Sequence, residues 1–261
     1  MATQSIALPA AQPAPLRYAR ILVKETICEW RRMFRTKVFS LSVIGFPVMF
    51  YLLFGSANRG TSFARYLVAG YSCMGVVSAC LFGIGMGIAL ERAQGWLELK
   101  RASPMPGAAY LVAKVMNCAA FSLLIVALLL ILGITIGGAS LTIAQALRLT
   151  AIILLGSVPF TAMALLIALL VPATSGPGII NLIYLPMSFA SGFWMPITYL
   201  PHWLQKIAPA LPTYHLAQLA LAVFGFAQPG RALVHWEALA GFTLLMLGAA
   251  WLVFTRSEAK A

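Results

Sequence analysis

Long apolar runs recur along the chain, and short segments that hold most of the charged residues separate them. A helix needs about 20 apolar residues to cross the roughly 30 Å of bilayer hydrocarbon. The runs predict six transmembrane helices, at about 38–55, 66–90, 108–136, 149–171, 179–195 and 239–254. We therefore expect an all-α integral membrane protein whose six-span domain covers residues 38–255.

The segment before the first run has a different pattern. Residues 1–15 are rich in Ala, Pro and Gln and carry no charge, which predicts a flexible cytosolic tail rather than a cleavable signal peptide. In 16–37, basic residues alternate with an apolar stripe at helical spacing, formed by Leu16, Val23, Ile27, Trp30 and Phe34. This pattern is typical of an amphipathic helix in the cytoplasmic membrane interface. Docking on a protein partner is a compatible alternative.

Residues 196–226 break the helical pattern between the fifth and sixth runs. The segment contains Pro196, Pro201, Pro209 and Pro212, and each proline removes a backbone donor. We expect a re-entrant helical hairpin in the outer leaflet, with short helices at about 202–208 and 214–226. A seventh span at 213–227 is the alternative, and it would place the C-terminus outside.

Charge supports a membrane protein and sets its orientation. Hydrophobic residues make up 61% of the chain and charged residues 9%, which leaves too little polar surface for a soluble domain. Most of the 18 Lys and Arg residues flank the side that holds both termini. By the positive-inside rule, both termini, including the tail 256–261, are expected in the cytoplasm, and the chain in the plasma or inner membrane.

Known reactive motifs are missing from the sequence. It has no Asp, no HExxH, no GxSxG and no GxxxxGK[ST], so we expect neither a membrane enzyme nor ATP binding by this chain. The four cysteines are expected to be small buried hydrophobic residues, and the Gly83-Ile-Gly85-Met-Gly87 run is expected to serve helix packing. The histidines 202 and 215 are expected to be interfacial or structural rather than metal ligands. Despite the net charge of +12, no basic stripe with interleaved aromatics indicates nucleic-acid binding.

The loop 91–106 between the second and third runs is the most informative segment. It opens on a charged pair, Glu91 and Arg92, and Gly95 allows a turn. Trp96, Leu97 and Leu99 then predict a short amphipathic helix, which Pro104 and Pro106 end. We interpret it as a docking helix that lies along the membrane and binds a soluble partner; a simple polar loop is the alternative.

The pattern Glu91-Arg-x-x-Gly-x-Leu-Glu98, followed by Ser-Pro, resembles this loop in type-2 ATP-binding-cassette (ABC) exporter permeases. The resemblance extends to the basic interfacial helix, the six runs and the Pro/Trp-rich segment. Trp96 departs from it, because Thr or Ser is more usual there. The resemblance implies a second permease copy or homologous permease, two separate ATPase subunits that bind ATP and Mg, no cofactor on this chain, and export of drugs, lipids or polysaccharide precursors.

Two groups of candidate site residues follow. For coupling to the ATPase we select Glu91, Arg92 and Gly95 for geometry and Trp96, Leu97 and Leu99 for docking; Glu91 or Arg92 is also expected to pair with Arg31, Arg32 or Glu29. For a substrate path we select one face of each of two runs: Ser72, Gly75, Ala79 and Phe82 in the second, and Asn181, Tyr184, Ser188 and Ser191 in the fifth.

These two faces leave alternatives open. Interhelical hydrogen bonding and close packing would also explain them. A mostly apolar path would suit amphipathic cargo. The rival function is a channel or facilitator that works without a motor, and the cargo itself is not evident from the sequence.

Overall fold

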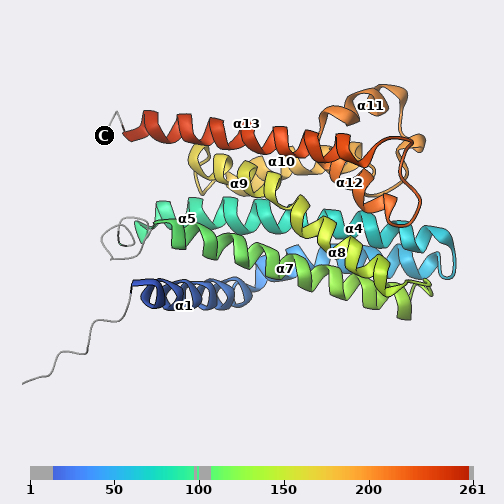
Figure 1. The fold of residues 1–261 in the computed structure, drawn as a ribbon, viewed down its shortest axis with the longest axis horizontal. Helices are drawn as coiled ribbons and strands as arrows, with labels where there is room; N and C mark the ends of the chain where they lie inside the picture. Colours follow the sequence, from blue (N-terminus) through green and yellow to red (C-terminus); the bar gives the residue numbers. More distant parts are fainter. Residues whose placement is uncertain (1–13, 97–98, 100–106, 259–261) are drawn as a thin grey trace, which may run out of the picture.

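The computed structural model describes residues 14–96, 99 and 107–258. Within these ranges the regular elements are all helical, and no strand occurs. The helices form an elongated bundle along a common axis (Figure 1). Helix α1 (Ala14–Arg35), the end of α5 (Gly87–Ala93) and the C-terminal end of α13 (Ala232–Glu258) lie at the same end of this bundle.

The first apolar run is one helical segment with two wider turns. It consists of α2 (Lys37–Ser40), the π-helical turn Leu41–Gly45, α3 (Phe46–Phe50) and a second π-helical turn, Tyr51–Gly55. Pro47 has no N–H to donate to the carbonyl of Val43, which favours a widened turn just before it.

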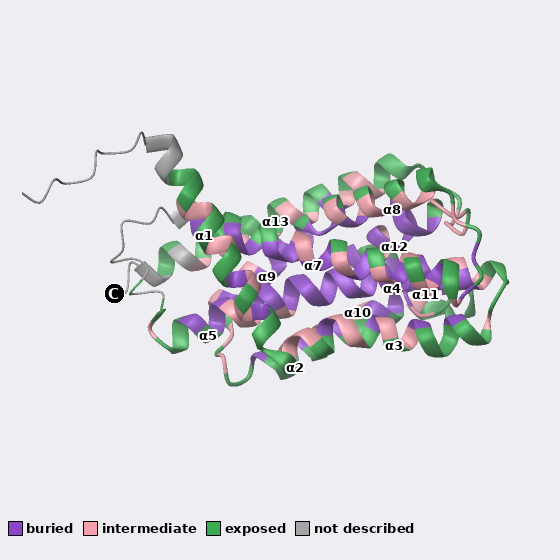
Figure 2. Ribbon diagram, turned by 90° about the horizontal axis from the view of Figure 1, so that it is seen from below, coloured by how far each residue is buried: buried purple, intermediate pink, exposed green. Residues whose placement is uncertain are grey.

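Helix α4 (Ser62–Cys80) occupies the centre of the bundle and is buried along nearly its whole length (Figure 2). A π-helical turn, Leu81–Met86, joins it to α5. Gly70 shows how closely α4 packs, because a Cβ atom at this position would lie 2.2 Å from the carbonyl oxygen of Phe193. Only glycine fits there without a backbone shift.

The next three helices run along the bundle. They are α7 (Gly107–Thr135), α8 (Ile143–Gly156) and α9 (Val158–Leu170). Thr142 begins α8 with a capping box: its Oγ1 accepts from the Gln145 amide, and the Gln145 side chain accepts from the Thr142 amide. A break at Ser157, just before Pro159, separates α8 from α9.

The C-terminal third starts with α10 (Gly176–Ala190) and a turn at Gly192, whose φ of 82° favours glycine. A 3₁₀ turn (Ile197–Tyr199), α11 (His202–Ile207), a second 3₁₀ turn (Ala208–Ala210) and α12 (Pro212–Ala222) follow before α13. The two short helices expected around 202–208 and 214–226 are therefore present, although the second ends at Ala222. The fifth run ends as a helix at Ala190 rather than near Pro196.

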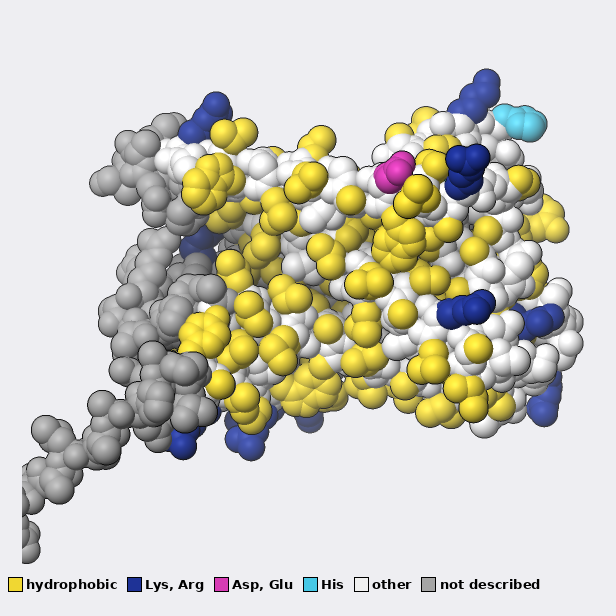
Figure 3. Space-filling view, in the orientation of Figure 1, with side chains coloured by type: hydrophobic (Ala, Val, Ile, Leu, Met, Phe, Trp, Pro, Cys, Tyr) yellow, Lys and Arg dark blue, Asp and Glu magenta, His cyan; other side chains and the backbone are white. Residues whose placement is uncertain are grey.

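Four helical stretches in the described residues are long and apolar enough to cross a membrane: Ser62–Ala93, Ala109–Thr135, Ile143–Leu170 and Ala232–Val253. Leu41–Gly55 and Gly176–Ala190 are shorter apolar helices. The fourth of the expected spans thus begins earlier than predicted, at Ile143. Lys and Arg side chains gather toward the two ends, and hydrophobic side chains cover the surface between them (Figure 3). The chain is an all-helical integral membrane protein.

Candidate coupling site

The candidate site lies where α1, α5 and α7 meet, at the end of the bundle that also holds the C-terminal end of α13. Glu91 is buried near the end of α5, and three side chains of the described residues donate hydrogen bonds to it. Lys114 Nζ lies 2.6 Å from its Oε1, Tyr110 Oη lies 2.7 Å from its Oε2, and Arg32 Nη1 also donates to Oε1. This carboxylate therefore joins α5 to both α1 and α7.

Glu29 on α1 completes the cluster and is 4% exposed. Its Oε2 accepts from Lys114 Nζ at 2.9 Å and from Arg32 Nη2 at 3.0 Å. Lys114 and Arg32 each bind both carboxylates, so opposite charges alternate around the site. Ions removed from water are tolerated only with such partners. We call these five residues the charge cluster: Glu29, Arg32, Glu91, Tyr110 and Lys114.

Glycines in the second apolar run make room for α1 beside the charge cluster. A Cβ atom at Gly83 would lie 2.8 Å from Met33 Cε, and one at Gly87 would lie 3.3 Å from Arg32 Nη2. A Cβ atom at Gly85 would lie 3.5 Å from the Ala164 carbonyl of α9. The expected role of this run in helix packing is therefore confirmed, with α1 as one of the packed elements.

Apolar contacts attach α1 to α7 next to the ion pairs. Trp30 and Phe34 each place their rings 5.0 Å from the ring of Phe121. Asn117 Nδ2 donates to the Thr26 carbonyl at 3.2 Å. The face of α1 that carries Glu29, Trp30 and Met33 is thus turned to the bundle, while Val23 and Ile27 stay exposed.

Of the two residues considered for pairing with α1, Glu91 makes the pair, through Arg32, and Arg92 reaches another helix. Instead of pairing with α1, its Nη1 donates to the Leu169 carbonyl at 2.8 Å and its Nη2 to the Val171 carbonyl at 3.0 Å. These carbonyls belong to the end of α9, where the last C=O groups of a helix lack partners within the helix. A cation at this position also interacts favourably with the helix dipole. Glu91 and Arg92 together link α5 to α1, α7 and α9.

The residues expected to dock a soluble partner come directly after Arg92 in the sequence. Gly95 has a φ of 73°, which suits glycine, and its amide donates to the Arg92 carbonyl at 3.2 Å. Trp96 is 55% exposed and Leu99 67% exposed. Leu97 lies outside the described residues. Two large apolar side chains are therefore presented to the surroundings immediately beyond the charge cluster.

The expected substrate-path residues of the second run lie inside this single chain. Ser72 and Ala79 are buried, and a Cβ atom at Gly75 would lie 2.5 Å from Ile125 Cγ2 on α7. Ser72 Oγ has no hydrogen-bond partner among the described residues. Phe82 meets Tyr184 edge to face, with ring centroids 6.5 Å apart.

Three of the four expected path residues of the fifth run make hydrogen bonds within the chain, and the fourth faces outward. Tyr184 Oη donates to the Met74 carbonyl at 3.0 Å, Ser188 Oγ accepts from Trp194 Nε1 at 3.2 Å, and Ser191 Oγ bonds Thr213 Oγ1 on α12. Asn181 instead faces outward from α10. The structure brings Phe82 and Tyr184 together but separates Asn181 from the other three, and the role of all eight in a path stays a prediction.

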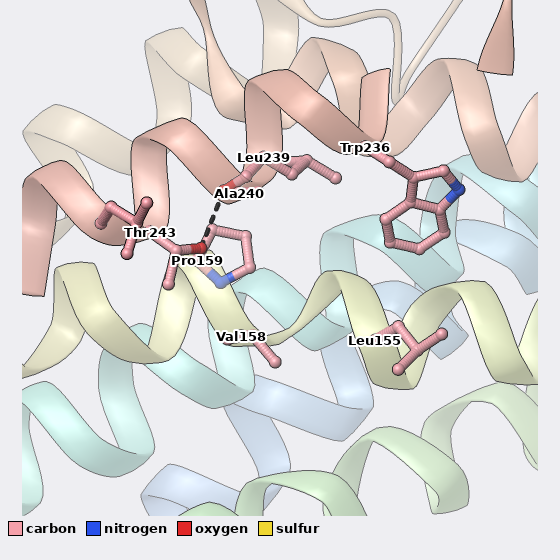
Figure 4. Close-up of a pocket in the computed structure, with 8 residues that line it drawn as sticks. Leu155, Val158, Pro159, Trp236, Leu239, Ala240 and Thr243 are labelled. Atoms are coloured by element: carbon pink, nitrogen blue, oxygen red, sulfur yellow. Dashed lines mark hydrogen bonds between the residues drawn. The ribbon is translucent and has the colours of Figure 1, made fainter. Parts of the chain in front are cut away.

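A separate apolar groove of about 460 Å³ lies between the α8–α9 break and α13 (Figure 4). Leu155, Val158 and Pro159 line one wall, and α13 supplies Trp236, Leu239, Ala240, Thr243 and Leu244. Thr243 Oγ1 donates to the Leu239 carbonyl at 2.7 Å, so this hydroxyl is already paired. None of the expected path residues lines this groove.

The sequence pointed to Glu91 and named Arg32 among its possible partners, but it did not lead to Lys114 or Tyr110. Lys114 was visible as the one basic residue inside the apolar run 108–136. An ionisable residue in such a run usually has a specific partner. Tyr110 gave no comparable signal, because its role depends on the helix rotation that brings it to Glu91.

Comparison with known proteins identifies the family of this chain. A family model described as ABC-2 type transporter matches residues 25–224. The chain is also 29% identical over 201 residues to a Bacillus subtilis (strain 168) protein named "Putative transport permease YvfS", with 75% of this chain and 82% of that protein covered. The matched segment includes the charge cluster and the helices from α2 to α12. The chain belongs to the ABC-2 type transporter family, as a transport permease.

Proposed function

We propose that this chain is the membrane subunit of an ATP-driven exporter. It spans the cell membrane six times, keeps both termini in the cytoplasm and takes its energy from two separate ATPase subunits that bind ATP and Mg. The observation that carries the proposal is the charge cluster, which joins α1, α5 and α7 directly before the exposed Trp96 and Leu99.

The first and fifth runs support six spans despite their shorter helices. The helical backbone around Leu41–Gly55 continues from Lys37 to Ala57, which at about 1.5 Å per residue reaches about 30 Å. Helix α10 is shorter, but other helices cover the turn that follows it. Tyr66 Oη donates to the Gly192 carbonyl, and Ser191 bonds Thr213. Irregular backbone at membrane depth is tolerated when protein covers it in this way.

A motor outside the membrane must act on a stiff part of the permease. Movement of the loop after α5 would pass to α1 and α7 through Glu91, and to α9 through Arg92. The π-helical turn Leu81–Met86 lies between this junction and α4, and such turns often mark functional bends. ATP-driven closure of the ATPase pair would then favour an outward-open arrangement of the helices, as a population shift.

A second permease, identical or homologous, would cover the outward face of α10. Asn181 is exposed there, and its side chain makes no hydrogen bond to the described residues. The neighbouring Leu182 and Phe189 are also exposed. A polar side chain on a membrane helix gains from a partner on a facing helix. With few polar side chains on these faces, the path between two permeases would suit amphipathic cargo such as a drug or a lipid.

Affinity purification from the native host tests this function. The tagged chain is extracted in mild detergent, and the eluate is assayed for ATP hydrolysis and analysed by mass spectrometry. We expect a co-purifying ATPase subunit with a phosphate-binding loop. The double variant Trp96→Ser, Leu99→Ser should lose it, whereas Trp203→Ser should retain it. Trp203 is a matched control because it is 62% exposed but lies on α11, near the other end of the bundle.

Two results would count against the proposal. If the chain elutes without hydrolytic activity and still passes solutes in vesicles, it is a motor-independent channel or facilitator. If the ATPase is retained by the Trp96, Leu99 variant but lost with Trp203→Ser, the motor binds elsewhere.

A further inference from the structure

Two histidines face each other near the end of the bundle remote from the charge cluster. His215 on α12 and His235 on α13 are half-buried, and their Nδ1 atoms lie 2.8 Å apart. The two residues are 20 positions apart in the chain, and their helices pack side by side. The expectation that His215 has no ligand role did not take this pairing into account.

The contact of the other ring nitrogen, Nε2, determines which nitrogen of His215 carries the proton. Nε2 lies 2.9 Å from the Pro209 carbonyl, and a carbonyl oxygen can only accept, so Nε2 carries the proton. In the neutral ring, Nδ1 then carries no proton, and its lone pair is directed at His235.

Histidines that bind metals have the same arrangement. They donate their second ring N–H to a carbonyl or carboxylate, which orients the lone pair toward the metal. We propose that His215 and His235 form a binding site for a borderline divalent transition-metal cation, with Zn²⁺ as the model ion. The cation would connect α12 to α13, and water would fill its remaining positions.

The geometry requires a small adjustment. With Zn–N distances of about 2.0–2.1 Å and tetrahedral angles, two ligand nitrogens lie about 3.3 Å apart. The Nδ1 atoms must therefore separate by about half an ångström from the distance in the structure. Without metal, the proton of neutral His235 lies on Nδ1, between the rings. When the cation binds, this ring takes its other tautomer, with the proton on Nε2, so that the Nδ1 lone pairs of both neutral rings can bind the cation.

Imidazole ligands determine the class of cation. Zn²⁺, Ni²⁺ and Cu²⁺ bind imidazole well, whereas Mg²⁺ and Ca²⁺ prefer oxygen. Tyr214 packs beside both rings, with centroid distances of 5.5 Å to His215 and 6.0 Å to His235. This site does not depend on the proposed function, because it lies away from the loop and requires no ATPase.

The test is a zinc chloride titration of the full chain. The protein carries a tag without histidines, is stripped with chelator and is studied in lipid nanodiscs at pH 7.5 by calorimetry. We expect saturable binding that His215→Ala and His235→Ala weaken by at least about tenfold, with His202→Ala unchanged. His202 is the matched control because it is the remaining histidine of the chain and lies exposed on α11.

A second readout keeps the test valid if one variant folds poorly. Zn²⁺ should raise the Tm of the wild type but not that of His235→Gln, and magnesium chloride should change neither. Cobalt chloride should give a visible absorption band, lost at pH 5, where protonated imidazoles cannot bind. No saturable zinc binding by the folded wild type would overturn the proposal. Binding that survives in the folded His215, His235 double variant would also overturn it.

Discussion

Lys114 Nζ lies 2.6 Å from Glu91 Oε1, and both residues are 2% exposed. The ammonium group of α7 and the carboxylate of α5 are thus held together in the protein interior. Lys114 also binds Glu29 of α1, so one side chain connects three helices. Removing one partner from such a site leaves a buried charge without compensation, which is far more costly than the net value of the pair.

The first prediction concerns this lysine. Lys114→Met should destabilise the chain by about 3–5 kcal/mol, because Glu29 and Glu91 would lose the buried cation that binds both carboxylates. Thermal unfolding in detergent, followed by circular dichroism, measures the effect. Lys37→Met is the control, since Lys37 is exposed at the start of α2 and should change stability by less than about 0.5 kcal/mol. Equal stability of the two variants would contradict a structural role of the charge cluster.

The second prediction concerns the pairing of α1 with α5. Arg32→Met and Glu91→Gln should be strongly non-additive, with a coupling energy of about 1 kcal/mol or more in a double-mutant cycle. The reason is that each variant removes the same ion pair. Charge reversal by Glu91→Lys should also abolish ATP-driven transport while membrane insertion continues. Additive single effects, or normal transport by Glu91→Lys, would show that α1 and α5 act independently.

The third prediction concerns Arg92 and the end of α9. Arg92→Ala should cost about 0.5–1.5 kcal/mol, because two carbonyls lose a charged donor at an exposed position. Arg92→Lys should retain only part of the stability that Arg92→Ala loses, since an ammonium group lacks the planar fork that reaches both carbonyls. Transport and stability are measured together. Full recovery by Lys would mean that charge alone matters at this position.

The fourth prediction concerns helix packing. Gly70→Ala should destabilise the chain by about 1–3 kcal/mol, because its Cβ atom would overlap the Phe193 carbonyl. Gly248→Ala is a matched control on α13, where nothing lies within 4 Å of the added atom. It should be neutral or stabilising by up to about 1 kcal/mol, as expected from helix propensity. Similar unfolding of both variants would contradict the close approach of α4 to Phe193.

The sequence predicted well those features that depend on local pattern. Apolar run lengths located the helices, and the prolines between 196 and 212 located the short helices α11 and α12. Helix ends were less accurate, because polar residues such as Gln145 can lie within the first turn of a helix that a capping box begins. Pro196 did not end α10, since the turn at Gly192 had already ended it.

The candidate site was predicted only in part, for a physical reason. Glu91 and Arg92 stand out as a charged pair at the end of an apolar run, and Arg32 was among the expected partners. Which partner each residue takes depends on helix rotation and packing, which spacing along the chain does not determine. Arg92 therefore reaches α9, and Lys114 completes the charge cluster from α7. Asn181 likewise shares helical spacing with Tyr184 and Ser188 but faces outward.

Site-specific photo-crosslinking in native membranes tests the central claim, that a motor subunit acts on the segment next to the charge cluster. A photoreactive amino acid replaces Trp96 in one variant and Trp203 in the other, and crosslinked products are identified by mass spectrometry. We predict that position 96 captures an ATPase subunit and that adding ATP with vanadate changes the yield. A chain that captures no ATPase at position 96, or captures one equally at position 203, would contradict the account.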